Sequence, residues 1–102
     1  MEKVKVVCLC GSRKFASEFV SEQTRLTLEG NVVLTPLFSF YNVEMEELTE
    51  EQKIMLKKLH FKRIEMADEV LVINKNGYVG ESTKKEIEYA TSLNKKINYL
   101  EN

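Results

Sequence analysis

The sequence lacks several features that specialised proteins need. Fifteen basic residues against sixteen acidic ones leave a formal charge of only -1 over 102 residues, so no strong field draws the chain onto polymeric nucleic acid or an anionic membrane. The apolar run at residues 6–10 is far shorter than the roughly 20 residues that span a bilayer, and no small-residue cleavage site accompanies it. We therefore expect a cytoplasmic protein with neither kind of partner.

Metal ligands and cofactor motifs are also scarce. The chain has two cysteines, Cys8 and Cys10, and one histidine, His60. Cysteines two apart in a strand share a face but are poorly placed to bond each other, so we expect two reduced core residues. Their spacing is not that of a zinc knuckle. Neither a GxGxxG nor a Walker lysine motif is present, and the sequence predicts no metal and no cofactor.

The length and the 43% apolar content suit one compact domain over residues 1–102, without repeats or linkers. Apolar, β-branched stretches alternate with helical ones. The expected strands are residues 3–10, 31–34, 68–73 and 96–100, and the expected helices follow Ser17, run from 49 to 66 and run from 83 to 93. This alternation predicts an α/β fold with a three-layer, Rossmann-like or flavodoxin-like open parallel sheet of four to five strands.

Local signals support these helices. Ser17 is expected to cap the first helix, and Gly30 to end it in a left-handed conformation. Thr49 and Gln52 form a capping-box pattern at the start of the longest helix. The apolar positions that recur at helical spacing in and beside that helix are Leu48, Met55, Leu59 and Met66.

Ligands bind such sheets beyond the carboxyl ends of the strands, which directs attention first to residues 11–16. In this segment Gly11 lets backbone N–H groups turn toward an anion, while Ser12 and Arg13 add a hydroxyl and a forked cation. The pattern fits a phosphate cradle. It is equally compatible with a plain tight turn, since a glycine after the first strand is common in α/β folds.

The loop from Asn74 to Gly80 leads into a helix whose first turns contain Glu86. A carboxylate at this place can point over the strand ends and attack the anomeric carbon of a bound sugar without a metal or cofactor. The competing interpretation is structural, because Thr83 and Glu86 also have the spacing of a capping box, in which the glutamate bonds back to the cap residue.

The middle of the longest helix contains His60. A lone helical histidine is usually a solvated or structural residue, and the neighbouring basic residues Lys57, Lys58, Lys62 and Arg63 read as a solvated face. In the segment 35–47, the aromatics Phe38, Phe40 and Tyr41 either stack on a base or pack the loop down.

Taken together, these residues resemble the nucleoside 2-deoxyribosyltransferase family, especially its branch of small deoxynucleoside 5′-monophosphate N-glycosidases. Cys10–Arg13 is similar to the family's first-strand loop, and Ala67–Val72 to its "AD-hydrophobic" strand. Residues 80–90 resemble its "GxxxELGYA" helix start. The similarity covers most of the chain. It implies a Rossmann-like domain that acts on a small nucleoside or nucleotide without a cofactor, and that forms a homodimer.

The resemblance also implies roles for individual residues. Glu86 falls on the catalytic nucleophile that attacks C1′ of the deoxyribose. His60 falls where the family has an acidic residue, and it can donate a proton to the departing base. Glu88 stands where the family usually has glycine. The expected substrate-binding residues are Gly11, Ser12, Arg13, Asn74, Tyr78, Gly80 and Ser82, with Ser12 and Arg13 on phosphate and Asn74 and Tyr78 on sugar hydroxyls.

Two other functions remain open from the sequence. The first is a noncatalytic module that binds or senses a nucleotide or nucleotide derivative on the same scaffold. The second is a small interaction protein without a ligand. Release of free base from deoxynucleosides or their monophosphates separates the enzyme from both.

Overall fold

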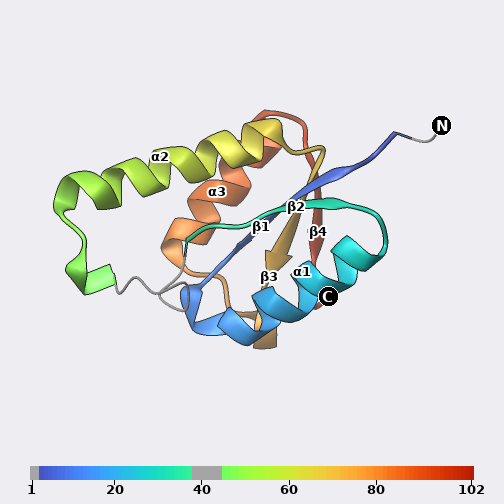
Figure 1. Ribbon diagram of the computed structural model, residues 1–102, viewed down its shortest axis with the longest axis horizontal. Helices are drawn as coiled ribbons and strands as arrows, with labels where there is room; N and C mark the ends of the chain where they lie inside the picture. The colour runs from blue at the N-terminus through green and yellow to red at the C-terminus, as the bar shows by residue number, and fades with distance from the viewer. Residues whose placement is uncertain (1–2, 38–44) are drawn as a thin grey trace.

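The computed structural model describes residues 3–37 and 45–102, in which strands and helices alternate along the chain (Figure 1). The strands are β1 (Val6–Gly11), β2 (Val32–Leu34), β3 (Glu69–Ile73) and β4 (Lys96–Tyr99). The helices are α1 (Ala16–Leu28), α2 (Glu50–Met66) and α3 (Glu81–Ser92). Short 3-10 turns occupy η1 (Arg13–Phe15), η3 (Met45–Glu47) and η4 (Lys75–Gly77).

The four described strands form one parallel sheet in the order β2-β1-β3-β4. The chain leaves β1 toward β2 on one side and later returns to β3 on the other. The strand order thus reverses between β1 and β3, and the loops that follow these two strands diverge there, which opens a crevice at their carboxyl ends. The predicted open parallel sheet is confirmed, with β1 and β3 at its centre, although the first strand spans Val6–Gly11 where residues 3–10 were expected.

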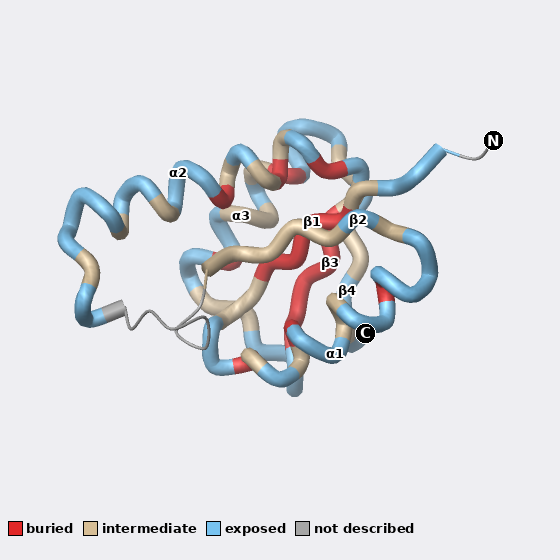
Figure 2. Tube along the Cα trace, in the orientation of Figure 1, coloured by how far each residue is buried: buried red, intermediate tan, exposed pale blue. Residues whose placement is uncertain are grey.

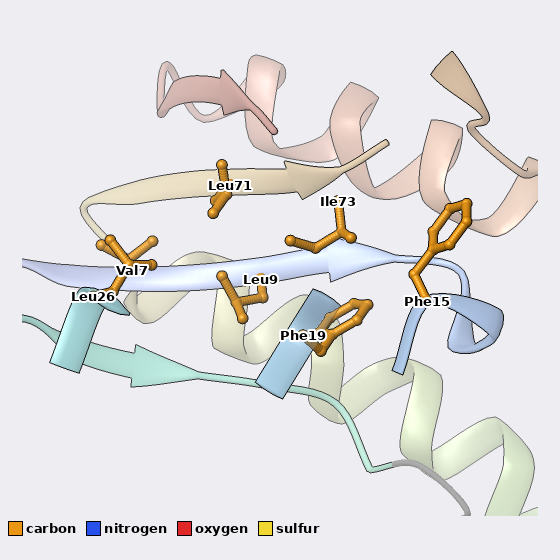
Figure 3. Packing of buried hydrophobic residues seen from close by; sticks show 7 residues of the cluster. All are labelled: Val7, Leu9, Phe15, Phe19, Leu26, Leu71 and Ile73. Atoms are coloured by element: carbon orange, nitrogen blue, oxygen red, sulfur yellow. The ribbon is translucent and has the colours of Figure 1, made fainter. Parts of the chain in front are cut away.

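The sheet is covered on both faces, which makes the fold a three-layer sandwich. On one face Val7 and Leu9 of β1 pack with Leu71 and Ile73 of β3 against the buried residues of α1, as Figure 3 shows. On the opposite face the sheet residues Cys8, Cys10, Val70 and Val72 pack with Ile64 of α2, with Ala67 directly after it and with Ala90 of α3. Burial on both faces explains why the central strands are continuously apolar, and Figure 2 shows burial concentrated on them.

Gly11 allows β1 and β3 to stay paired up to the cavity. It is the last residue of β1 and lies in register with Ile73. A Cβ atom at this position would lie 2.9 Å from both the Cβ and the backbone oxygen of Ile73. A side chain would therefore push the two central strands apart at the point where their loops diverge.

Two helix predictions need correction. Helix α1 begins one residue before Ser17, and its cap position, Phe15, makes no side-chain cap bond; instead Ser12 accepts a hydrogen bond from the backbone N–H of Lys14 and caps η1. The η1 turn thus leads directly into α1, which leaves no separate start for Ser17 to cap. Phe19 and Leu26 are the buried residues of α1.

The capping box of Thr49 and Gln52 at the start of α2 is present. However, the apolar stripe expected on this helix faces solvent, because Met55, Leu59 and Met66 are all exposed. The face that packs on the sheet carries His60 and Ile64 instead.

Among the described residues, the buried side chains of α2 are confined to its C-terminal half. The residues of α2 before His60 are exposed or half-buried, and this half of the helix extends beyond the sheet (Figures 1 and 2). Phe61 packs edge-on against Tyr89 of α3, and the Tyr89 hydroxyl donates to Glu65. Within the described ranges, no helix has the length and apolar character needed to cross a membrane.

Candidate functional site

A cavity of about 510 Å³ lies at the carboxyl ends of β1 and β3. This volume falls in the range of about 300–1,000 Å³ that is usual for small-molecule sites. Its walls come from the loop after β1, the start of α3, the projecting half of α2, and Pro36 and Leu37 after β2. It therefore occupies the crevice that the reversal of strand order creates.

Glu86 lines this cavity from the second turn of α3. The helix begins at Glu81 with Gly80 as its cap residue, and no side chain makes a cap bond there. The alternative in which Thr83 and Glu86 form a capping box is therefore wrong: Thr83 lies inside the helix, buried against the cavity. Glu86 is thus free of the structural task that its spacing suggested.

The surroundings of Glu86 act on its charge in opposite directions. Burial raises the pKa of Glu86 above its usual range, because few water molecules are left to solvate the ionised carboxylate. The nearby imidazole of His60 and a hydrogen bond from Cys10 favour the ionised form and partly offset this rise. Burial is the larger effect, so the carboxyl binds its proton more tightly than an exposed glutamate does.

His60 points inward, contrary to the solvated interpretation. It is 4% exposed and lines the cavity. Its Nε2 lies 3.7 Å from a carboxylate oxygen of Glu86, which is an ion pair when the imidazole is protonated. Two residues 26 positions apart in sequence, which the resemblance singled out separately, thus face each other across the floor of the cavity.

The loop after β1 supplies Gly11, Ser12 and Arg13 to the opposite wall. Arg13 is exposed, and among the described residues no carboxylate lies within ion-pair distance of it. Lys57 of α2 lines the same cavity, whereas Lys53 beside it is paired with Glu50 at 3.4 Å. The guanidinium of Arg13 is therefore available to an anionic group of a ligand.

Tyr78, Gly80 and Ser82 also line the cavity, at the junction of β3 and α3. The ring of Tyr78 is fixed on two sides: Phe15 packs edge-on against it, and the Lys14 amino group lies 3.3 Å from its centre. This aromatic wall links the loop after β1 to the loop after β3.

Asn74, which was expected to bind sugar hydroxyls, is not among the lining residues of the cavity. Its amide nitrogen donates to the backbone oxygen of Glu101 at 2.9 Å, and its amide oxygen accepts from the Glu101 N–H at 2.8 Å. Both polar groups of the side chain hold the chain after β4 against the end of β3. The structure gives Asn74 a structural task at that place.

The fold also brings together three residues that the sequence kept apart. Cys8 and Cys10 are free thiols on the same face of β1, fully buried as expected. His60 lies above them, with its Nε2 3.4 Å from the Cys10 sulfur and 4.0 Å from the Cys8 sulfur. The pairing of the two cysteines follows from strand geometry, but nothing in the sequence indicates which helix faces them.

Other cavity residues could not be singled out from the sequence. They are Lys53, Ile54, Leu56 and Lys57 of α2, together with Pro36, Leu37 and Thr83. The α2 residues among them lie on a segment whose sequence indicates a solvated, lysine-rich face. The aromatics Phe38, Phe40 and Tyr41, considered as base-stacking residues, lie outside the described residues.

The chain was compared with known proteins. No protein-family model matches it, and a search of curated proteins finds no match. The geometry of the cavity and the resemblance of individual motifs are thus the grounds on which a function can be proposed.

The role of Asn74 can be tested by its removal. We expect Asn74→Ala to lower the free energy of unfolding by about 1–3 kcal/mol, because it leaves the two backbone groups of Glu101 without their partners. Urea unfolding measures this loss. Affinity for any nucleotide ligand should stay within about twofold of wild type at a temperature where both proteins are folded, and a selective loss of affinity without a loss of stability would return Asn74 to the site.

The raised pKa of Glu86 predicts that the free energy of unfolding differs between Glu86→Gln and wild type in a way that depends on pH. Because its pKa is raised in the folded protein, the protonated carboxyl favours folding at low pH, and this contribution is lost as the pH rises through the folded-state pKa. The stability of Glu86→Gln relative to wild type should therefore increase as the pH rises from below 4.5, the ordinary value for this group, toward neutrality.

Urea unfolding of both proteins over a series of pH values measures this difference. Repeating the pair in a His60→Gln background removes the titration of the facing imidazole. A relative stability of Glu86→Gln that decreases with rising pH in that background would contradict the buried-carboxyl assignment.

Proposed function

We propose that this protein cleaves or transfers the N-glycosidic bond of a deoxynucleoside or a deoxynucleoside 5′-monophosphate. The observation that carries the proposal is the half-buried carboxylate of Glu86, which lines a nucleotide-sized cavity with His60 at 3.7 Å. The motif resemblance supplies the class of substrate. The site needs neither a metal nor an organic cofactor for this reaction.

In the proposed mechanism the carboxylate of Glu86 attacks C1′ of the deoxyribose. The bond between C1′ and the base nitrogen breaks, and its electron pair leaves with the base. A covalent ester between Glu86 and the sugar results, as in retaining glycosidases. Water in hydrolysis, or the N–H group of a second base in transfer, then attacks C1′ and gives its proton to the imidazole of His60, and Glu86 is released as the carboxylate.

His60 has two tasks in this scheme. While protonated, it favours the ionised form of Glu86 against the cost of burial, as the opposing effects on the Glu86 pKa indicate. It then gives its proton to the departing base, which leaves with an extra electron pair. A single buried imidazole beside the nucleophile is suited to both tasks because it lies within reach of the same region of the cavity.

The remaining expected residues have places compatible with substrate binding. Arg13 and the hydroxyl of Ser12 bind the 5′-phosphate beside the backbone at Gly11. Tyr78 offers its ring face and hydroxyl to the sugar or base from the opposite loop. Gly80 and Ser82 complete the wall at the start of α3.

Glu88, which departs from the family pattern, does not obstruct the cavity. It is exposed and is not a lining residue, because two residues along a helix rotate a side chain away from the face that carries Glu86. The bulk of this side chain therefore does not argue against catalysis.

A second candidate is supported by the same carboxyl group. Because burial raises the pKa of Glu86, its carboxyl holds a proton more tightly than an exposed glutamate does and can serve as a hydrogen-bonding group. The alternative function is a noncatalytic module that binds or senses a nucleotide, with Glu86 as a hydrogen-bonding group. For either function we propose a cytoplasmic protein, in keeping with its two free buried thiols, and a homodimer.

Replacement of the nucleophile distinguishes the two functions. We expect Glu86→Gln to lower base release from deoxynucleosides or their monophosphates by at least about 10³-fold, because a neutral amide cannot form the glycosyl ester. Chromatography of free base after incubation with a substrate panel measures the rate. The noncatalytic candidate predicts no release by wild type, together with nucleotide binding that Glu86→Gln changes little.

Glu81→Gln is the matched control, since Glu81 lies on the same helix and lines the same cavity but is exposed beside Lys84. Its rate should stay near wild type. Wild-type rates in Glu86→Gln would remove this residue from the mechanism.

Phosphate recognition is tested at Arg13. We expect Arg13→Ala to weaken binding of a deoxynucleoside 5′-monophosphate by about 10-fold or more, the loss of a charge-assisted hydrogen bond, while binding of the nucleoside without phosphate changes far less. Calorimetric titration compares the two ligands. Arg25→Ala is the control, because Arg25 is paired with Glu22 and Glu29 on α1, and equal losses for both ligands in Arg13→Ala would contradict a phosphate-specific role.

A further inference from the structure

The thiols of Cys8 and Cys10 and the imidazole of His60 form a compact group beneath the cavity, which we call the thiol–imidazole cluster. One ligand atom from each residue, two sulfurs and a ring nitrogen, lies within 4.8 Å of the other two. All three residues are buried. The cluster is held by β1 and α2, so its geometry depends on regular elements and not on a loop.

The spacing of these atoms is that of ligands around one small cation. With zinc–sulfur bonds of about 2.3 Å and zinc–nitrogen bonds of about 2.0–2.1 Å, the ligand atoms of a tetrahedral site lie about 3.5–3.8 Å apart. The His60 Nε2 lies 3.4 Å from the Cys10 sulfur and 4.0 Å from the Cys8 sulfur. The Glu86 oxygen lies 3.7 Å from the same nitrogen on the cavity side, outside the group of three atoms that lie within 4.8 Å of one another.

Hydrogen bonds alone satisfy this arrangement poorly. Two sulfurs and a carboxylate oxygen surround Nε2, but an imidazole nitrogen carries at most one hydrogen and satisfies one of them at a time. A cation among the two sulfurs and the ring nitrogen would instead bond to all three, with the Glu86 carboxylate on its cavity side. Burying several metal-ligating atoms together in the core costs free energy unless a positive charge balances theirs.

The protonation of the thiols also favours a cation. Hydrogen bonds from Cys10 and His60 lower the pKa of Cys8 to about 6, against the opposing effect of burial. The pKa of Cys10 is raised, because it holds its proton toward Cys8 and is itself buried, and binding of a cation would release that proton.

The cavity gives access to the cluster. His60 and Glu86 both line the cavity, while Cys8 and Cys10 lie behind them in the sheet. Two thiolates and an imidazole are the soft and borderline ligands that zinc binds in tetrahedral sites, whereas magnesium and calcium require oxygen ligands. The chemistry of the group therefore selects a thiophilic cation over the common hard ones.

We propose that Cys8, Cys10 and His60 bind one zinc ion, with Glu86 as the fourth ligand from the cavity side. Binding does not depend on the proposed glycosidic reaction. It does have a consequence for that reaction, because a carboxylate bonded to zinc is no longer a free nucleophile. Zinc and a nucleotide substrate would therefore compete for Glu86.

Cobalt(II) substitution tests the site directly. The full chain, reduced and freed of metal with a chelator, is titrated with cobalt(II) chloride and followed by absorption spectroscopy. We expect one equivalent to produce thiolate-to-cobalt charge-transfer absorption in the near ultraviolet and intense visible bands of a tetrahedral ion, with zinc then abolishing both. A wild-type titration without charge-transfer absorption would overturn the proposal, whatever the stability of any variant.

Variants identify the ligands. Cys10→Ser should reduce the charge-transfer absorption. It should also weaken zinc binding by at least about 10-fold, measured in competition with a chromophoric chelator, because mutation of residues that only support metal ligands already lowers metal affinity by about 10–100-fold. Glu86→Gln should keep the thiolate absorption but bind zinc at least about 10-fold more weakly, and unchanged affinity would remove Glu86 from the ligand set. Glu81→Gln should match wild type, and unchanged cobalt spectra in Cys10→Ser would refute the cluster.

Base release by the metal-free protein separates this proposal from the proposed function. Base release without a cobalt signal would leave the reaction standing and overturn the zinc site. A cobalt signal without base release under metal-free conditions would leave the zinc site standing and overturn the reaction. Where both are present, one equivalent of zinc should inhibit release, and undiminished release would show that Glu86 is not a ligand.

Discussion

The pairing of β1 with β3 is the constraint on which the rest of this structure depends. The two strands lie at the centre of the sheet and stay in register from Val7 opposite Glu69 to Gly11 opposite Ile73. Because the strand order reverses between them, the loops at their ends separate and leave the cavity. Because β1 is buried on both faces, alternate residues serve two layers: Val7 and Leu9 support α1, whereas the two cysteines face α2 and α3.

The same pairing explains why the cavity and the thiol–imidazole cluster are adjacent. Cys8 and Cys10 lie just before Gly11, the last residue of β1, and the chain enters the cavity wall at Gly11. His60 stands at the boundary, in contact with the sulfurs beneath it and with Glu86 at the cavity floor. One imidazole therefore connects the core of the protein to its candidate chemistry.

Much of the fold could be predicted because burial on both faces gives the central strands a distinctive, continuously apolar sequence. The packing face of α2 could not, because its apolar residues are not confined to one side. Met55 and Leu59 suggested a stripe that is exposed in the structure, while the residue that packs on β1 is a histidine. A polar residue on a core face is visible in sequence only when its partners are known, and here they lie about 50 positions away.

The candidate site was predictable to the extent that it follows the ends of strands. Gly11 ends β1 and Arg13 follows it closely, and the general position of ligands in such sheets identifies them. Asn74 shows the limit of that reasoning, since it also follows a strand but is used to hold Glu101. The start of α3 was misplaced for a related reason: the Thr83 and Glu86 spacing imitates a cap, whereas the helix begins at Glu81 after an uncapped Gly80.

The one-sided attachment of α2 has a mechanical consequence. The contacts that hold the helix are at His60, Phe61, Ile64 and Glu65, and Glu50 at its other end borders the cavity. At about 1.5 Å per residue, the fourteen residues from Ile64 back to Glu50 form a lever of about 21 Å. A rotation of about 10° around the attached end would move the far wall of the cavity by nearly 4 Å while His60, close to the fulcrum, would shift by only about 1 Å. A change in cavity size by such a rotation would leave the imidazole that faces Glu86 nearly in place.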